Sequence, residues 1–329
     1  MTQEAVIRSI AAVADKFNAA APGHRFHLYF PIWQDNWDLD KIKKDALQSC
    51  TRIPSPVLDL LDGLRTRQQN LFAAFPEGLR VAGISSAPFA TGLGNEHPVE
   101  NGFAFLTPCG LPYLAGSGVK GVLRRAAEEL ALFPEDFAQG DTPVLTLLDV
   151  WWLFGFEGAA GAWWPLSASE QKDVSDEAKE GRVRFRERFL THRGTLADHP
   201  DLPAFICRVI PRGKDRDRYL ANPGQFLDEL DQIQVRGDIQ TRGALTFWDV
   251  FPRPAKGALS VEIMPPHHSD YYQHGGTPND ADQPNPIPFL AIPPDSQFDF
   301  HVICAAPDLP RRVAADLATA TPERVHSCL

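Results

Sequence analysis

The first quarter of the chain sets charged residues among apolar ones with the spacing of helices. Residues 1–20 carry four charged side chains within an apolar pattern, which predicts an amphipathic helix ending near Pro22 and Gly23. A second helix is expected from about residue 56 to 74, directly after Pro-Ser-Pro at 54–56. We therefore expect residues 1–78 to form an N-terminal helical appendage whose apolar faces pack on the main domain.

The pattern of residues 111–132 predicts a strand, a glycine turn and a helix. A short apolar segment precedes Gly116, Gly118 and Gly121, and an amphipathic stretch follows. Its apolar stripe consists of Val122, Leu123, Ala126, Ala127, Leu130 and Leu132. Glycines allow positive φ and close approach of a ligand, and a helix start offers unpaired N–H groups to an anion. With the cations Lys120, Arg124 and Arg125 nearby, this pattern is typical of a phosphate site.

The sequence of this glycine segment is also compatible with other interpretations. Residues 116–121 (GSGVKG) match the dinucleotide fingerprint, and Asp149 stands where a ribose-binding acid would be expected. The segment fails as a Walker A loop because Lys120 is followed by Gly121. A glycine turn needed only for close packing of strand and helix is the remaining alternative.

The later pattern predicts core strands and a basic insertion. Strands are expected at 79–89, in the apolar run of 144–154 that leads to Gly155, and at 258–264, 288–292 and 298–305. A last helix is expected from 308 to 320. Residues 156–240 read as an insertion before the core resumes at Gly243, and alternation within 182–189 favours a strand with four arginines on one face, although a helix stays open.

A longer set of motifs carries a family resemblance. It comprises residues 91–102 (TGLGNEHPVENG), 110–113 (GLPY), 116–124, 242–252 (RGALTFWDVFP), 265–272 and 285–290. In these residues, over roughly 79–305, the chain resembles the RAMP superfamily of CRISPR RNA-binding proteins. Within it, the sixth-subunit family of type III-B (Cmr) effector complexes is the most similar.

The resemblance implies an α+β architecture for residues 79–329. The expected fold is a ferredoxin-like (RRM-like, βαββαβ) RAMP domain. Ala115 and Gly118 replace the Pro and Ser that are usual in the family's glycine loop. No second glycine-rich loop or closing strand is recognised after Ala320, so the final strand is expected to be missing.

Composition and charge narrow the class of protein. The 329 residues are 43% hydrophobic, and no uncharged apolar stretch approaches 18 residues, so we expect a cytoplasmic protein without a membrane span or signal peptide. The five cysteines are widely spaced without a C-x-x-C pair, which favours reduced structural thiols over a disulfide framework or a zinc site. No cofactor is expected.

The distribution of charge favours a nucleic-acid partner on one face only. The net charge is −10, yet residues 179–218 hold 11 Lys or Arg against 6 Asp or Glu. A basic patch on an acidic body suits a subunit that contacts RNA on one side and protein elsewhere. Lysines, arginines and N–H-rich turns supply the backbone contacts that such binding needs. The candidate RNA-binding residues are Asn95, His97, Gly116, Ser117, Gly118, Lys120, Gly121, Arg124, Arg182, Arg184, Arg186 and Arg188.

The resemblance implies a non-catalytic RNA-binding structural subunit. It would cap the effector filament near the 3′ end of the guide RNA, with guide RNA, target RNA and other RAMP subunits as its partners. The first alternative is a metal-independent RAMP endoribonuclease, for which His267, His268 and Tyr271 would be the catalytic residues. The second is a nucleotide-dependent enzyme that uses the glycine segment.

Overall fold

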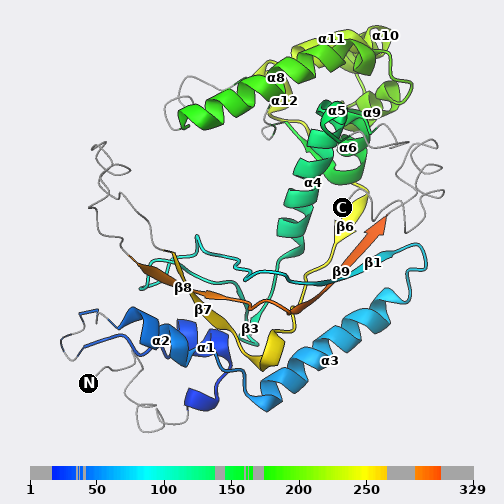
Figure 1. Cartoon of the computed structure of the whole chain (residues 1–329). Coiled ribbons are helices and arrows are strands. Elements are labelled where there is room, and N and C mark those ends of the chain that lie inside the picture. The colour runs from blue at the N-terminus through cyan, green and yellow to red at the C-terminus, as the bar shows by residue number, and fades with distance from the viewer. Residues whose placement is uncertain are drawn as a thin grey trace. The chain divides into compact units, whose positions relative to one another are not determined.

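The structure, a computed structural model, describes residues 17–34, 36, 38–39, 42–137, 145–158, 161, 163–165, 174–264 and 286–304. These form two compact units, the first from Met1–Ser117 and Phe247–Val302, the second from Gly118–Thr246 and Ile303–Leu329. Helices and strands are both present, as expected for an α+β protein (Figure 1). The predicted helix at 308–320 lies outside the described residues.

The strands of the first unit run mainly antiparallel. Strand β1 (Leu79–Ile84) pairs with β9 (Gln297–Cys304), from Leu79 opposite Val302 to Ile84 opposite Gln297, and β9 has β6 (Leu245–Phe247) as its other neighbour. Strands β7 (Ser260–Met264) and β8 (Ile287–Ala291) form a second antiparallel pair, and β2 (Phe105–Leu106) with β3 (Leu111–Pro112) a third. The strands expected at 258–264, 288–292 and 298–305 are thus confirmed.

The order of strands in a ferredoxin-like sheet stays a prediction. Within the residues that the structure describes, the strands form one three-stranded sheet and three two-stranded pairs. The expected strand at 79–89 is shorter in the structure and ends at Ile84, and Phe89 then forms a single bridge with Ile292.

In the described part of the chain, three α-helices precede β1 and belong to the first unit. They are α1 (Pro22–His27), α2 (Lys43–Ser49) and α3 (Ser55–Phe72). Helix α3 confirms the second predicted helix. Pro22 opens α1, where its missing N–H costs no hydrogen bond. The helix expected over residues 1–20 stays a prediction. Residues 1–16 lie outside the described part of the chain.

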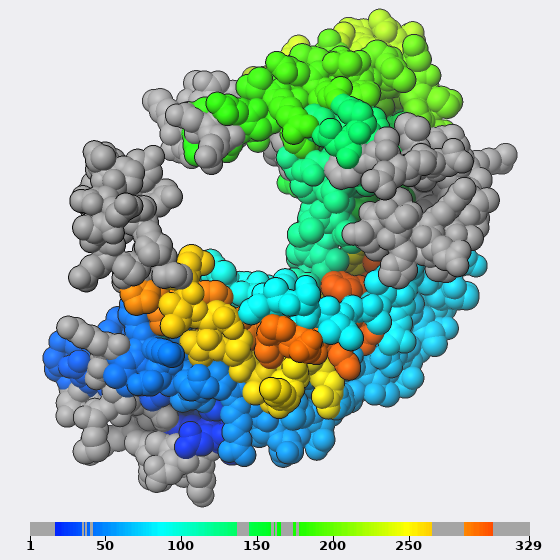
Figure 2. Space-filling view, viewed as in Figure 1, coloured from blue at the N-terminus to red at the C-terminus, as the bar shows by residue number. Residues whose placement is uncertain are grey.

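The helices of residues 17–78 pack on the strands of the same unit. Helix α2 contacts β7 and β8, visible as blue against orange and yellow in Figure 2. The Arg25 guanidinium donates to the carbonyl oxygens of Ser49 and Arg52, and Arg65 donates to Asp299 on β9 at 2.7 Å. An N-terminal appendage with its boundary at residue 78 stays a prediction.

The second unit is mostly helical (Figure 1). Its helices are α4 (Gly116–Leu132), which begins in the first unit, α5 (Pro134–Phe137), α6 (Leu147–Phe154), α8 (Asp176–Ala197), α9 (Leu202–Val209), α10 (Lys214–Ala221), α11 (Pro223–Glu229) and α12 (Ile233–Arg236). Strands β4 (Gly155–Glu157) and β5 (Gln240–Arg242) pair antiparallel, with Gly155 opposite Arg242. Helices α8 to α12 lie between these two strands in the sequence.

The run that leads to Gly155 is a helix, so the expected core strand there is wrong. The Thr146 hydroxyl accepts the N–H of Asp149, and the Asp149 carboxylate accepts the N–H of Thr146, which makes a capping box for α6. All eight side chains of α6 are buried, as expected for core. A continuous apolar run looks the same in a buried strand and in a buried helix, and the cap selects the helix.

Candidate nucleic-acid interface

Helix α4 begins within the glycine segment itself. Leu114 forms a bridge with Val250, and the chain enters the helix at Gly116, whose N–H donates to Asp249 Oδ1 at 2.8 Å. Gly116, Gly118 and Gly121 therefore lie in the first turns of α4. The predicted turn of positive φ between strand and helix is wrong, because helix geometry continues back to Gly116.

The glycines of this segment have different surroundings. A Cβ on Gly116 would lie 2.3 Å from the carbonyl oxygen of Phe247, so this position needs glycine for close packing of backbone. A Cβ on Gly121 would meet no atom within 4 Å. The packing explanation therefore holds for Gly116, whereas the surface at Gly121 is open to a ligand.

The cations beside this surface differ in how far they are neutralised. Arg124 Nε donates to the buried Glu128 at 2.9 Å, and burial raises the pKa of Glu128. Burial and the nearby charges of Arg124 and Arg242 lower the pKa of Lys120. No ion pair or hydrogen bond of the Lys120 amine is found in the described part of the chain. The positive charge of Lys120 is therefore available to a bound anion.

The apolar stripe predicted for α4 is only partly buried. Ala127 and Leu132 are buried, but Val122 is 71% exposed and Ala126 is exposed as well. The outer face of the helix near Gly121 thus carries small and apolar side chains.

His97 is held by contacts within the first unit. Its ring stacks on Phe26, with centroids 3.7 Å apart and planes 5° apart, and Nε2 lies 3.0 Å from the Phe26 carbonyl oxygen. Nδ1 accepts the Val99 N–H at 3.4 Å, so Nε2 carries the proton of a neutral imidazole. Burial lowers the pKa of His97 to about 4. Asn95, in the same loop, is exposed, and RNA contact by either residue stays a prediction.

The alternating arginines lie on helix α8, so the strand favoured by the alternation is wrong and the helix alternative is correct. At 100° per residue, positions two apart fall on opposite sides of a helix, and positions four apart share a side. Arg182 donates to the carbonyl oxygens of Gly161 and Trp164, and Arg186 forms two 2.6 Å bonds with Asp231.

The other two alternating arginines, Arg184 and Arg188, face helix α5. Arg184 pairs with Asp136 at 2.8 Å, and Arg188 pairs with Glu135. Both guanidinium groups also lie over the Phe133 ring. The four arginines are therefore split between two sides of the helix and attach α8 to its neighbours.

The remaining candidates stand as follows. Asp149 is buried and serves the α6 cap, so the dinucleotide hypothesis loses its acidic residue. His267, His268 and Tyr271 lie outside the described residues. Within the described ranges, no three His, Cys, Asp or Glu side chains gather closely enough to hold a metal ion. None of the helices in that part of the chain combines the length and apolar character needed to cross a membrane.

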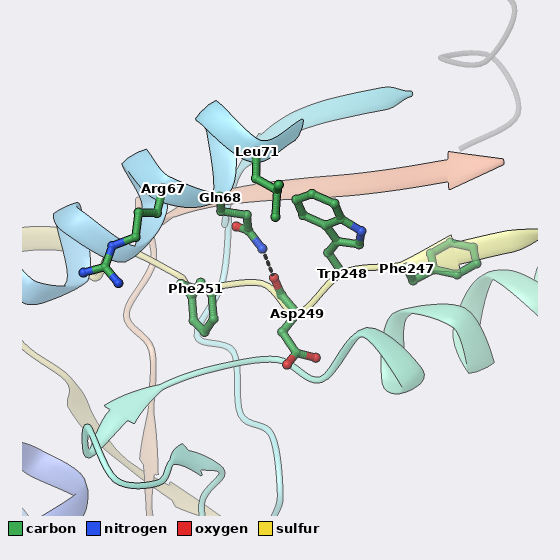
Figure 3. Close-up of a pocket in the computed structure, with 7 residues that line it drawn as sticks. All are labelled: Arg67, Gln68, Leu71, Phe247, Trp248, Asp249 and Phe251. Atoms are coloured by element: carbon green, nitrogen blue, oxygen red, sulfur yellow. Dashed lines mark hydrogen bonds between the residues drawn. The ribbon is translucent and has the colours of Figure 1, made fainter. Parts of the chain in front are cut away.

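A cleft in the first unit was not anticipated from the sequence. Its walls come from α3 and from residues 247–251, and its lining residues are Arg67, Gln68, Leu71, Phe247, Trp248, Asp249 and Phe251 (Figure 3). In the sequence, only the aromatic residues of 242–252 pointed to this site. The α3 residues lie some 180 positions away, so no local pattern joins them to that segment.

Comparisons with known proteins identify a family model and a curated relative that match this chain. A family model described as the RAMP superfamily matches residues 86–306. The CRISPR system Cmr subunit Cmr6 of Pyrococcus furiosus is 27% identical over 215 residues, which cover 63% of this chain and 52% of that protein. The chain thus spans about half the length of this curated relative.

Two solved structures are also similar. The cryo-EM structure of the Type III-B Cmr-beta bound to cognate target RNA contains a chain that is 14% identical, with a TM-score of 0.41, covering 85% of this chain and 64% of that one. The crystal structure of Cmr6 from Pyrococcus furiosus matches at 20% identity and a TM-score of 0.26, covering 77% and 89%. The resemblance predicted from the motifs is confirmed by the family model and the curated relative. Because the family model matches more than half of its residues, the chain belongs to the RAMP superfamily.

Proposed function

We propose that this chain is a non-catalytic RNA-binding structural subunit of a type III-B CRISPR effector complex. It would cap the filament near the 3′ end of the guide RNA, hold guide and target RNA, and dock other RAMP subunits. The name of the curated relative, a subunit of the CRISPR system Cmr, supports this proposal. A ferredoxin-like core is proposed as the scaffold.

The open surface at the start of α4 carries the proposal. Gly121 leaves room for a phosphate, Lys120 supplies a charge that no carboxylate in the described residues neutralises, and Ser117 is exposed one turn earlier. Asp249 already occupies the Gly116 N–H, so the phosphate is expected further along the helix. Arg124, Arg182 and Arg186 would contribute less because their guanidinium groups already bind groups of the protein.

Arg184 and Arg188 are also proposed to contact the RNA backbone, with a smaller contribution to binding than Lys120. Their side chains are 64% and 33% exposed, so each can add an RNA phosphate to its existing pair.

Titration of the full chain with labelled guide-length RNA at several salt concentrations tests the proposal. Lys120→Ala should weaken binding and reduce the slope of log K against log salt by about 0.7–0.9, the value for one phosphate contact. Lys44→Ala is the matched control, since Lys44 is an exposed lysine on α2. We avoid Arg124→Ala because it would leave the buried Glu128 without its partner.

Three results would contradict the proposal. One is equal behaviour of the Lys120 and Lys44 variants. Another is cutting of the RNA during the titration, which would favour the endoribonuclease alternative. The third is saturable NAD or ATP binding without RNA binding, which would favour the nucleotide-dependent enzyme.

A further inference from the structure

The cleft between α3 and residues 247–251 lies wholly within the first unit and has a volume of about 400 Å³. Arg67 stands at one end and Phe247 at the other, with Gln68, Asp249 and Trp248 between them (Figure 3). Its lining combines aromatic rings, an amide, a carboxylate and a guanidinium group. This combination matches the chemistry of a nucleotide better than that of an apolar side chain.

The Trp248 ring, here called the aromatic wall of the cleft, is held in place by other aromatic side chains. Edge-to-face contacts fix the Trp248 ring against Phe72 and Phe75, with centroids 5.5 and 5.9 Å apart. The buried His301 ring lies 5.9 Å away, and the Trp248 N–H of the backbone donates to the His301 carbonyl oxygen. An aromatic ring that is already ordered loses little entropy when a base stacks on it.

The polar groups at the centre of the cleft leave acceptors unused. Gln68 Nε2 donates to the Asp249 carbonyl oxygen at 2.7 Å, so the amide is oriented and its Oε1 points elsewhere (Figure 3). Asp249 uses Oδ1 to accept the Gly116 N–H, which leaves Oδ2 without a hydrogen bond in the described residues. Each of these two acceptors favours a partner with an amino group, and the carboxylate disfavours a phosphate beside it.

Arg67 provides the opposite charge at the end of the cleft. Its side chain is exposed, and none of the hydrogen bonds or ion pairs found in the described part of the chain involves its guanidinium group. A phosphate attached to a nucleoside in the cleft would therefore find its cation there.

We propose that this cleft holds one unpaired base of bound RNA, stacked on the aromatic wall, with an amino-bearing base preferred over uracil. The inference rests on the proposed function, because it requires a chain that binds RNA. Base recognition in single-stranded RNA uses this combination of stacking and hydrogen bonding to the base edge. The lining favours RNA over a protein segment, because Arg67 matches the phosphate of one nucleotide and an unused acceptor of the cleft matches the amino group of its base.

Single abasic substitutions moved along the labelled guide-length RNA test the cleft directly. With the unmodified chain, the substitution at one position should weaken binding by about 5- to 150-fold, the range for loss of one stacked base. Replacing the base at that position by uracil should cost about 2- to 10-fold for the lost hydrogen bond. Trp248→Leu should abolish this dependence on position, while Trp248→Phe keeps a ring and most of the effect.

Two further variants guard against misfolding of the Trp248 variants, since Trp248 contacts Phe72 and Phe75. Phe251→Leu should reduce the dependence on position, and Arg67→Ala should lower the salt slope relative to Lys44→Ala. Melting temperatures verify that each variant is folded.

The outcomes separate the cleft from the proposed function. If RNA binds but no abasic position matters, or the same position matters equally in Trp248→Leu, the cleft proposal is wrong and RNA binding stands. If no RNA binds, both fail. If Trp248→Leu leaves RNA affinity unchanged and releases a partner subunit instead, the cleft is a protein-docking surface, which also overturns the inference.

Discussion

Replacing two glycines of helix α4 by alanine should change stability in opposite directions. Gly116 lies against the backbone of residues 247–248, where a new Cβ would be 2.3 Å from the Phe247 carbonyl oxygen and 2.9 Å from the Trp248 carbonyl carbon. Gly121 lies one turn and a half further, where a new Cβ would meet nothing within 4 Å. The substitution is chemically the same, so only the surroundings differ.

The expected magnitudes follow from these distances. At Gly121, alanine removes the entropy cost of glycine in a helix and should stabilise the protein by about 0.8–1 kcal/mol. At Gly116, the Cβ contacts backbone atoms that cannot rotate away, so the strands or the helix must move, at a cost of about 1–3 kcal/mol. The two variants should therefore differ by about 2–4 kcal/mol.

Urea unfolding followed by tryptophan fluorescence measures this difference, with Gly63→Ala on α3 as a control. Gly63, like Gly121, has nothing near its missing Cβ, so alanine should stabilise there too. A Gly116→Ala protein as stable as the unmodified chain would refute the packing argument. If Gly121→Ala raises stability yet weakens RNA binding, the open space at Gly121 serves a ligand and not the fold.

Three other predictions concern ionisable groups. As the pH falls from 6.5 towards 4, the unfolded chain takes up a proton at His97 that the folded chain refuses, so urea titrations should show a stability loss of about 1–2 kcal/mol that His97→Gln removes. Asp299→Asn should destabilise the first unit by about 2–3 kcal/mol in the same assay, because Arg65 loses its partner. Burial alone raises the pKa of Asp299, but hydrogen bonds from two arginines bring it below its ordinary value of 3.8. The stability from this carboxylate is thus complete above about pH 4 and is lost below, and the Asn variant should lack that loss. Arg186→Ala should lower the melting temperature by breaking its two bonds to Asp231; an unchanged melting temperature would mean that this half-buried pair contributes nothing.

Local signals in the sequence were sufficient where spacing and punctuation agreed. Helix α3 was predictable because Pro-Ser-Pro precedes a helical apolar period, and strands β7 to β9 because branched and aromatic residues alternate there. The alternation of arginine and apolar residues in 182–189 misled, since two-residue spacing of long side chains is equally compatible with a helix that has partners on both sides.

Contacts between distant segments could not be predicted. The packing of Gly116 against Phe247 and the cleft between α3 and residues 247–251 both join residues more than 100 positions apart. The family motifs identified the segments that take part, but nothing in their spelling places Arg67 or Gln68 beside them.

The short ladder of β4 and β5 gives the helices between them a particular evolutionary freedom. Since Gly155 and Arg242 are directly opposite each other, the chain leaves and returns through adjacent positions. Segments whose ends meet in this way tolerate replacement, because the rest of the fold experiences only the fixed distance between two strands. Helices α8 to α12 could thus be exchanged for a shorter or longer piece, and relatives can diverge in size and partner preference there while strands β1 and β9 stay unchanged.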